Sequence, residues 1–297
     1  MINADSVVVV DEITTASKDY KIGRLTLNKP KALNALDLEM AGIMLDALRQ
    51  WQARSDIVAV VIDAAGEKAF CAGGDISEMY RTGIAGEYDY GRQFWRDEYR
   101  LNAFMASYPK PIVSFLHGFT MGGGVGVGCH GSHRIVCESS QIAMPECGIG
   151  LVPDVGGTYL LASAPGRLGE YLGLTATRMK SGDAIYAGFA DRFVPQDKWE
   201  LLKAALITTG DVAAIEEYSA PAPESELAKQ QVRVVVLERT RFAAGASGAT
   251  AGVISPLWHV NPDVEPMWRL GMRSLELFPW LVSELSEAGV DPEFRQT

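Results

Sequence analysis

Short apolar runs that alternate with helical patterns are the feature that most constrains how this 297-residue chain can fold. Three of the runs are typical of buried strands: 58–65 (VAVVIDAA), 111–118 (PIVSFLHG) and 133–138 (HRIVCE). Helical patterns fall around them, at 76–82, 88–107, 121–130 and 156–173. Strands that alternate with helices at this spacing indicate an α/β chain with a largely parallel sheet.

The N-terminal part adds a hairpin and a helix to this pattern. Two β-rich runs, SVVVVDEI and KIGRLTLN, are separated by a polar, turn-like stretch and predict the hairpin. Apolar residues then recur at helical spacing and predict one amphipathic helix; they are Leu36, Met40, Ile43, Met44, Leu48 and Trp51.

The composition of the chain changes after the α/β part. Residues 219–231 are polar and rich in proline and alanine, which is typical of a linker or a frayed helix, and a new β-rich run begins at 232. We therefore expect a domain over 1–218, a linker over 219–231 and a C-terminal fragment over 232–297 that is not an independent domain.

Charge and hydropathy limit the partners and the location of the protein. The formal net charge of −10 argues against nucleic acid and anionic membranes as partners, although a phosphorylated ligand remains compatible with it. No apolar run is long enough to span a membrane. The N-terminus has neither the features of a secretory signal nor those of an Arg-rich transit peptide, so we expect a cytoplasmic protein.

The cysteines and histidines do not indicate a metal or disulfide site. None of the four cysteines lies in a CxxC pair, and we expect them to be small buried residues. His130 and His133 form an HGSH stretch whose spacing suits neither a helical metal pair nor a standard zinc motif. We therefore predict no bound metal.

Two glycine clusters, FCAGGD at 70–75 and FTMGGGVGVG at 119–128, each follow a strand and open a helical pattern. Glycines at such places let the backbone approach a ligand closely, and N–H groups at a helix start can face an anion or a developing oxyanion. Tight packing alone explains many such clusters. Neither cluster matches the phosphate-binding loops of nucleotide-binding proteins.

Four stretches that include these clusters resemble the crotonase, or enoyl-CoA hydratase/isomerase, superfamily over roughly residues 7–230. They are LNKPKALNAL (27–36), KAFCAGGDI (68–76), KPIVSFLHGFTMGGG (110–124) and AMPECGIGLVPDVGG (143–157). The resemblance implies a spiral of ββα units that binds an acyl-CoA, with two backbone N–H groups on the thioester oxygen. Those donors map onto Gly74 and Gly123. Coenzyme A is then part of the substrate, no separate cofactor is implied, and a homo-oligomer is compatible with the resemblance.

The acidic residues decide which reaction the resemblance implies. Hydratases of this superfamily use two glutamates; the second matches Glu146, but the position of the first is Gly126 here. The combination of MGGGVG, MPE and GLVPDVGG is most similar to 3-hydroxyisobutyryl-CoA hydrolases, which carry an aspartate at the position of Asp154. The resemblance thus implies hydrolysis of a short 3-hydroxyacyl-CoA, as in valine catabolism. An enoyl-CoA isomerase or hydratase-type enzyme and an inactive, CoA-binding fusion are the alternatives.

This resemblance gives each site residue a role with an alternative beside it. Glu146 is expected to act as a general base for water or to attack the thioester directly. Asp154 is expected to orient the water or to bind the 3-hydroxyl group, unless it only caps the helix that follows. Gly126 would leave space for that hydroxyl group or the water. Lys31, with Lys29, lies where the family places basic residues near the CoA phosphates, although solvated surface lysines would look the same.

Two further expectations concern the cover of the acyl pocket and the start of a helix. Residues 83–108, with Phe94, Trp95 and Tyr99, are expected to cover the pocket, although an ordinary core helix would carry the same aromatic residues. Asp75 is expected to cap the helix over 76–82 and has no catalytic role in this interpretation.

The C-terminal fragment resembles a different family. Residues 232–256 (VRVVVLERTRFAAGASGATAGVISP) resemble an early part of glycine oxidase and D-amino-acid-oxidase-like flavoproteins, in which an acid here matched by Glu238 binds the ribose. SELAKQQ stands where the glycine turn that holds the pyrophosphate would be, so we predict that no flavin binds. The chain thus resembles two fragments joined near Gln231.

Overall fold

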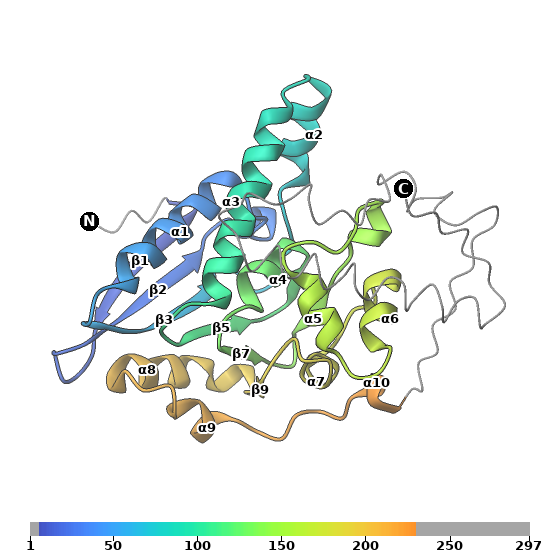
Figure 1. The fold of residues 1–297 in the computed structure, drawn as a ribbon. Coiled ribbons are helices and arrows are strands. Elements are labelled where there is room, and N and C mark those ends of the chain that lie inside the picture. Colours follow the sequence, from blue (N-terminus) through green and yellow to red (C-terminus); the bar gives the residue numbers. More distant parts are fainter. Residues whose placement is uncertain (1–5, 230–297) are drawn as a thin grey trace.

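The structure is a computed structural model that describes residues 6–229 (Figure 1). The predicted C-terminal fragment, with Glu238, lies outside the described residues. The larger sheet has the strand order β1-β2-β3-β5-β7-β9, and only the β1–β2 pair is antiparallel. Its strands are β1 (Val8–Thr14), β2 (Lys21–Leu27), β3 (Ile57–Ala64), β5 (Ile112–Leu116), β7 (His133–Val136) and β9 (Arg192–Phe193). The α/β class, the parallel sheet and the N-terminal hairpin are confirmed.

A second, smaller parallel sheet lies beside the first. It consists of β4 (Ala69–Cys71), β6 (Phe119–Met121) and β8 (Gln141–Ala143), in that order. Each of these short strands follows a strand of the larger sheet and leads into helical structure, which is the repeated ββα unit that we predicted. The helical elements after them are α2 (Ile76–Ile84) with α3 (Tyr88–Ala106), α4 (Gly123–Gly128) and the 3₁₀ turn η2 (Glu146–Ile149).

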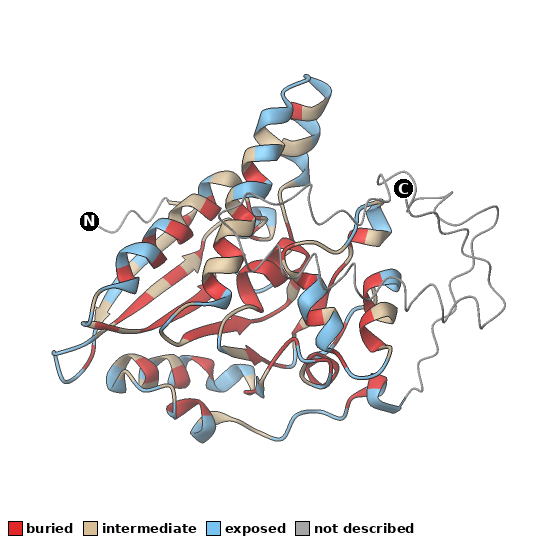
Figure 2. Cartoon of the chain, viewed as in Figure 1, coloured by how far each residue is buried: buried red, intermediate tan, exposed pale blue. Residues whose placement is uncertain are grey.

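Helices cover both faces of the larger sheet (Figure 1). On one face lie α1 (Leu38–Gln52) and α3, and on the other lies α8 (Trp199–Thr209). Successive side chains of β3 point to opposite faces of the sheet and so contribute to the hydrophobic cores on both faces. Val60 and Ile62 belong to the core that includes α1, whereas Ala59 and Val61 belong to the core that includes α8. Figure 2 shows that the sheet interior and helix α4 are buried, while the tip of α2 is exposed.

The remaining elements surround this core. They are η1 (Pro30–Ala32), α5 (Gly157–Ser163), α6 (Leu168–Thr175), α7 (Ser181–Tyr186), η3 (Gln196–Lys198), α9 (Ala214–Tyr218) and α10 (Glu226–Lys229). The single helix expected over 156–173 is thus two helices. Pro165 interrupts it, because proline lacks the N–H group that a helix interior needs.

The described part of the expected linker packs onto the domain. Ala220 pairs with Phe193, and α10 lies against α7. There the Asp183 carboxylate accepts hydrogen bonds from the Ser225 hydroxyl at 2.7 Å and from the Leu227 N–H at 3.0 Å. Ordered contacts therefore extend to Lys229, while the boundary at 231/232 stays a prediction. Within residues 6–229, no helix has the length and apolar character needed to cross a membrane.

Candidate active site

The backbone N–H groups of Gly74 and Gly123 lie next to each other, where β4 and β6 end. A Cβ atom placed on Gly123 would be only 3.0 Å from the Gly74 nitrogen. Within residues 6–229, neither N–H donates a hydrogen bond to the protein. The preceding residues, Gly73 and Gly122, have φ values of +116° and +48°, which glycine adopts readily. The two turns therefore bring two unused donors to one place, as an oxyanion site requires.

Glu146 lies beside this pair of donors. It begins η2 after β8, its side chain is only 5% exposed, and its Oε1 atom is 2.5 Å from where a Cβ of Gly122 would be. Oε2 is buried and has no hydrogen-bond partner among the described residues. Burial raises the pKa of Glu146 to about 8, and the nearby charge of Asp154 acts in the same direction. A carboxyl group with this pKa is suited to proton transfer near neutral pH.

Asp154 belongs to the same site and does not cap a helix. The cap residue of α5 is Gly156, and no side chain caps that helix. The Tyr99 hydroxyl group instead donates to Oδ2 of Asp154 at 3.4 Å. Burial raises the pKa of Asp154 to about 6, although its own backbone N–H and Tyr99 counteract this shift. The helix-cap interpretation is therefore wrong for this side chain.

A third carboxyl group, Glu98 of α3, was missed in the sequence. It is 1% exposed, and its Oε1 is 2.8 Å from where a Cβ of Gly123 would be. Burial raises its pKa well above the ordinary value, and the charges of Asp154 and Glu146 raise it further. Of the two other carboxyl groups, Asp154 loses its proton before Glu146 as the pH increases. A carboxyl group whose pKa is raised in this way can act as a hydrogen-bond donor, here next to Gly123.

The space expected beside Gly126 is not open. A Cβ on Gly126 would be 2.8 Å from the amide nitrogen of Asn102 and 2.8 Å from the Cβ of Val155. The glycine thus allows α3 and the loop of Asp154 to approach α4. It does not leave a cavity for a substrate hydroxyl group or a water molecule, which corrects that expectation.

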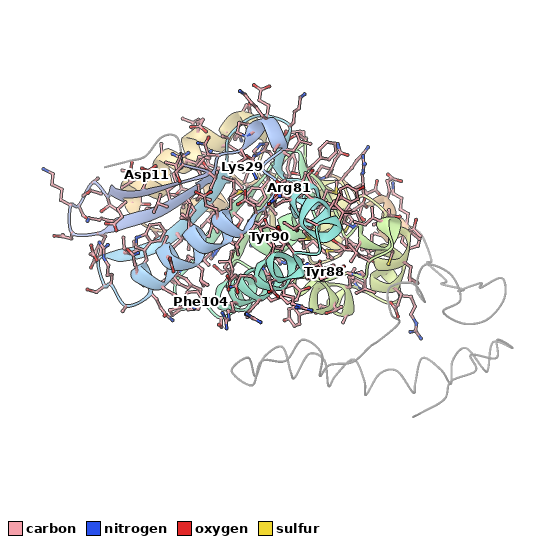
Figure 3. All side chains as sticks on the ribbon, turned by 90° about the horizontal axis from the view of Figure 1, so that it is seen from above. Asp11, Lys29, Arg81, Tyr88, Tyr90 and Phe104 are labelled. Atoms are coloured by element: carbon pink, nitrogen blue, oxygen red, sulfur yellow. The ribbon has the colours of Figure 1, made fainter. Side chains whose placement is uncertain are left out.

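The two lysines expected near the CoA phosphates differ in their surroundings. The Lys29 ammonium group binds Asp37 at 2.6 Å and Asp75 at 3.3 Å (Lys29 is labelled in Figure 3). Lys31 is exposed on η1 and forms no ion pair with the described residues. Lys31 is thus the one with an unpaired charge, and its contact with CoA stays a prediction. The Asp75 side chain pairs with Lys29 instead of capping α2, which corrects the role expected for it.

Side chains of helix α3 lie at the site (Tyr88, Tyr90 and Phe104 of this helix are labelled in Figure 3). The Phe94 ring is 3.5 Å from where a Cβ of Gly74 would be, and Tyr99 contacts Asp154. Trp95, in contrast, is 37% exposed. Phe94 and Tyr99 thus lie beside Gly74 and Asp154, and the cover of an acyl pocket by residues 83–108 stays a prediction.

The cysteines of the described part are all free thiols. Cys71, Cys129 and Cys137 are buried, as predicted, whereas Cys147 is half-buried. Burial raises the pKa values of Cys71 and Cys129 to about 12, so these thiols stay protonated and unreactive at neutral pH. Among residues 6–229, no group of three or more histidine, cysteine or acidic side chains is arranged to hold a metal ion.

Comparison with known proteins adds two family matches. A family model described as enoyl-CoA hydratase/isomerase matches residues 22–243. Another, described as FAD dependent oxidoreductase, matches residues 225–297. Both resemblances inferred from the motifs are thereby confirmed.

Individual relatives and solved structures agree with the first of these matches. The mitochondrial 3-hydroxyisobutyryl-CoA hydrolase of Danio rerio is 47% identical over 63% of this chain and 49% of its own length; that of Rattus norvegicus is 44% identical over 66% and 52%. The chain thus spans about half the length of these curated relatives. The crystal structure of an enoyl-CoA hydratase from Rhodobacter sphaeroides 2.4.1 is 48% identical, with a TM-score of 0.71 over 91% of this chain and 74% of that one. A carnitinyl-CoA dehydratase from Mycobacterium thermoresistibile is 39% identical, with a TM-score of 0.72 over 90% and 75%.

Proposed function

The chain belongs to the enoyl-CoA hydratase/isomerase family, and from this premise we propose that it hydrolyses the thioester of a short 3-hydroxyacyl-CoA. The foremost substrate is 3-hydroxyisobutyryl-CoA, a compound of valine catabolism. The observation that carries the proposal is the position of the buried Glu146 carboxyl group beside the two unused N–H groups of Gly74 and Gly123. The names of the curated relatives support the choice of hydrolysis and of this acyl group.

The site can perform the hydrolysis with its own groups. The N–H groups of Gly74 and Gly123 donate to the thioester oxygen and stabilise the negative charge that develops there. Glu146 takes a proton from water as the water oxygen attacks the carbonyl carbon. When the carbon–sulfur bond breaks, the CoA thiolate takes up that proton, which leaves the free acid, CoA and an ionised Glu146.

Direct attack by Glu146 is the alternative route to the same products. An oxygen of Glu146 would displace the CoA thiolate and form an anhydride, which water then hydrolyses. Repeated turnover in ¹⁸O-labelled water separates the two routes. Water that attacks the glutamyl carbonyl of the anhydride leaves its label in the Glu146 carboxyl group, whereas the general-base route never labels that group, so label in Glu146 identifies the anhydride route.

Asp154 and Glu98 can support this chemistry in different ways, because Asp154 is ionised and Glu98 is protonated. Near neutral pH the Asp154 carboxylate can accept a hydrogen bond from the attacking water or the 3-hydroxyl group. Protonated Glu98 can donate a hydrogen bond next to Gly123. One acceptor and one donor, both fixed on the domain, would orient a 3-hydroxyacyl group.

Hydration of an enoyl-CoA is a second candidate, because the solved relatives include an enoyl-CoA hydratase and Glu98 supplies a second buried carboxyl group. Release of free CoA thiol distinguishes the candidates. A hydrolase liberates CoA from 3-hydroxyisobutyryl-CoA. A hydratase instead removes the ultraviolet absorbance of an enoyl-CoA without freeing thiol, an isomerase moves the double bond, and an inactive protein does none of these.

The rate of hydrolysis should depend on pH through Glu146. We expect kcat/KM to rise as the pH increases through about 8, because only ionised Glu146 can accept a proton or attack. In Asp154→Asn the midpoint should be lower, because the negative charge that helps retain the Glu146 proton is gone. The matched control is Asp46→Asn on α1, whose side chain is 73% exposed. An equal midpoint in all three proteins would contradict the assignment of the titration to Glu146.

We also propose that the protein binds no flavin, although its C-terminal residues match an oxidoreductase family. Dinucleotide affinity in such folds comes largely from the glycine turn that holds the pyrophosphate, and SELAKQQ replaces that turn here. The purified protein should be colourless, and added FAD should not raise its melting temperature. Yellow cofactor in stoichiometric amount after dialysis would refute this prediction.

A further inference from the structure

The loop that carries Asp154 contains an unusual backbone conformation. Val155 has a φ of +48°, in the left-handed region that β-branched side chains avoid. Four other non-glycine residues between 6 and 229 have a positive φ, and none of them is β-branched: Lys18, Leu33, Asn34 and Ala176. Such a conformation persists only where the surrounding structure holds it in place.

Two contacts hold Val155 in this conformation. The Nε2 atom of His130 is 2.7 Å from the Val155 carbonyl oxygen; because a carbonyl can only accept, Nε2 must carry the hydrogen. On the other side, the buried Val155 side chain fills the space that a Cβ on Gly126 would take, 2.8 Å away. The next residue, Gly156, has a φ of +73° and would place a Cβ 2.8 Å from the same Nε2 atom. The loop is thus clamped between His130 and helix α4.

The contacts of His130 and Gly126 with Val155 connect the two parts of the proposed site, which are helix α4 with Gly123 and the loop with Asp154. Helix α4 begins with the oxyanion donor Gly123, and His130 follows its end by two residues. Asp154 directly precedes Val155, so the φ of Val155 and the position of its carbonyl group fix where the Asp154 backbone lies. We propose that His130 is a positioning residue that holds Asp154 at the site through its hydrogen bond to Val155. For catalysis, this inference rests on the proposed hydrolysis.

The state of His130 agrees with this role. Burial lowers the pKa of His130, although its bond to Val155 counteracts this, and the ring is therefore neutral near pH 7. A neutral imidazole has one N–H, and here that N–H is directed at Val155. His133, three residues later, contacts Ser132 and is half-buried, so it provides a matched control.

Rate measurements test the catalytic side of the inference. His130→Ala should lower kcat for CoA release about 10–10²-fold, the effect of a misplaced polar group. His130→Gln should recover most of this loss, because the amide nitrogen of glutamine lies close to the position of Nε2. His130→Asn has an amide nitrogen that does not reach Val155, so it should behave like alanine. His133→Ala should leave the rate unchanged.

A double variant separates positioning from a general loss of stability. If His130 acts through Asp154, then His130→Ala combined with Asp154→Asn should be no slower than Asp154→Asn alone, within about 3-fold. If the rate loss of the double variant equals the product of the losses of the two single variants, His130 acts independently of Asp154, and the proposal is overturned. Failure of glutamine to recover more rate than asparagine would overturn it as well.

Hydrogen exchange tests the clamp without any assay of activity. The Gly157 N–H donates to the Asp154 carbonyl oxygen at 2.6 Å and reports on the loop. His130→Asn should exchange faster over residues 150–157 than His130→Gln, with unchanged exchange in β3 and β5. Equal exchange in these two variants would refute the clamp. If wild type releases no CoA while the loop still responds, the proposed function fails and the clamp stands.

Discussion

Replacing Glu146 with glutamine is expected to lower the rate of CoA release by about 10²–10⁴-fold, the usual effect of losing a positioned general base. Glutamine keeps the size of the side chain but can neither accept the proton nor form an anhydride. The carboxyl group lies within contact distance of Gly122, which directly precedes the proposed oxyanion donor Gly123. The measurement is free thiol released from 3-hydroxyisobutyryl-CoA by wild type and Glu146→Gln. Near-normal release by the variant would remove Glu146 from the mechanism.

Thermal stability provides the control for this variant. The pKa of Glu146 determines whether the variant melts at a higher or a lower temperature than wild type. The folded-state pKa, about 8, lies above the ordinary value of 4.5. Folding therefore benefits from the protonated form, and this benefit is present below the ordinary pKa and is lost as the pH rises through about 8. Glutamine stays neutral, so the variant should melt at a higher temperature than wild type at about pH 9 and at a similar temperature at about pH 5. Lower activity together with higher stability identifies a catalytic carboxyl group rather than a structural one.

The larger elements of the fold could be predicted from the sequence, whereas the smaller sheet could not. Strand β3 is a nearly continuous apolar run of eight residues rich in β-branched side chains, and α1 is a long helix with amphipathic periodicity, so each has a clear pattern. Strands β4, β6 and β8 have three residues each, and pairing between distant segments creates them. A pattern of three residues carries no usable period. These strands position Gly74 and Gly123, so the geometry of the site could not follow from periodicity alone.

The candidate site was predicted in part, because family motifs mark some of its residues and packing determines the others. Glu98 lies in a strongly charged helix, where an acid usually faces solvent. Its spacing from Phe94, Leu101 and Met105 nevertheless places it on the buried face of α3, and this signal was available in the sequence. Gly126 shows the opposite case. Its missing side chain suggested a cavity, but a residue type does not reveal which neighbours fill the space that it leaves.

Replacing Gly123 with alanine should lower kcat by about 10²–10³-fold, the size of effect seen when an oxyanion donor no longer reaches the oxygen. The added Cβ would lie 3.0 Å from the Gly74 nitrogen and 2.8 Å from Oε1 of Glu98. It would occupy the place where the thioester oxygen meets both N–H groups, and the backbone on either side cannot move away without disturbing β4 or α4. The N–H of residue 123 remains in the variant, so the loss would come from geometry rather than from a missing donor.

The control for Gly123→Ala is Gly42→Ala on α1, where an added Cβ would meet nothing within 4 Å. Alanine favours a helix over glycine, so Gly42→Ala should keep full activity and melt at the same temperature as wild type or slightly above it. Free CoA has no thioester oxygen, so its dissociation constant should change little in Gly123→Ala while kcat falls. This combination locates the defect at the oxygen of the thioester. If Gly123→Ala instead lowers CoA affinity and leaves kcat unchanged, the N–H groups at Gly74 and Gly123 bind the nucleotide portion of the ligand and do not form the oxyanion site.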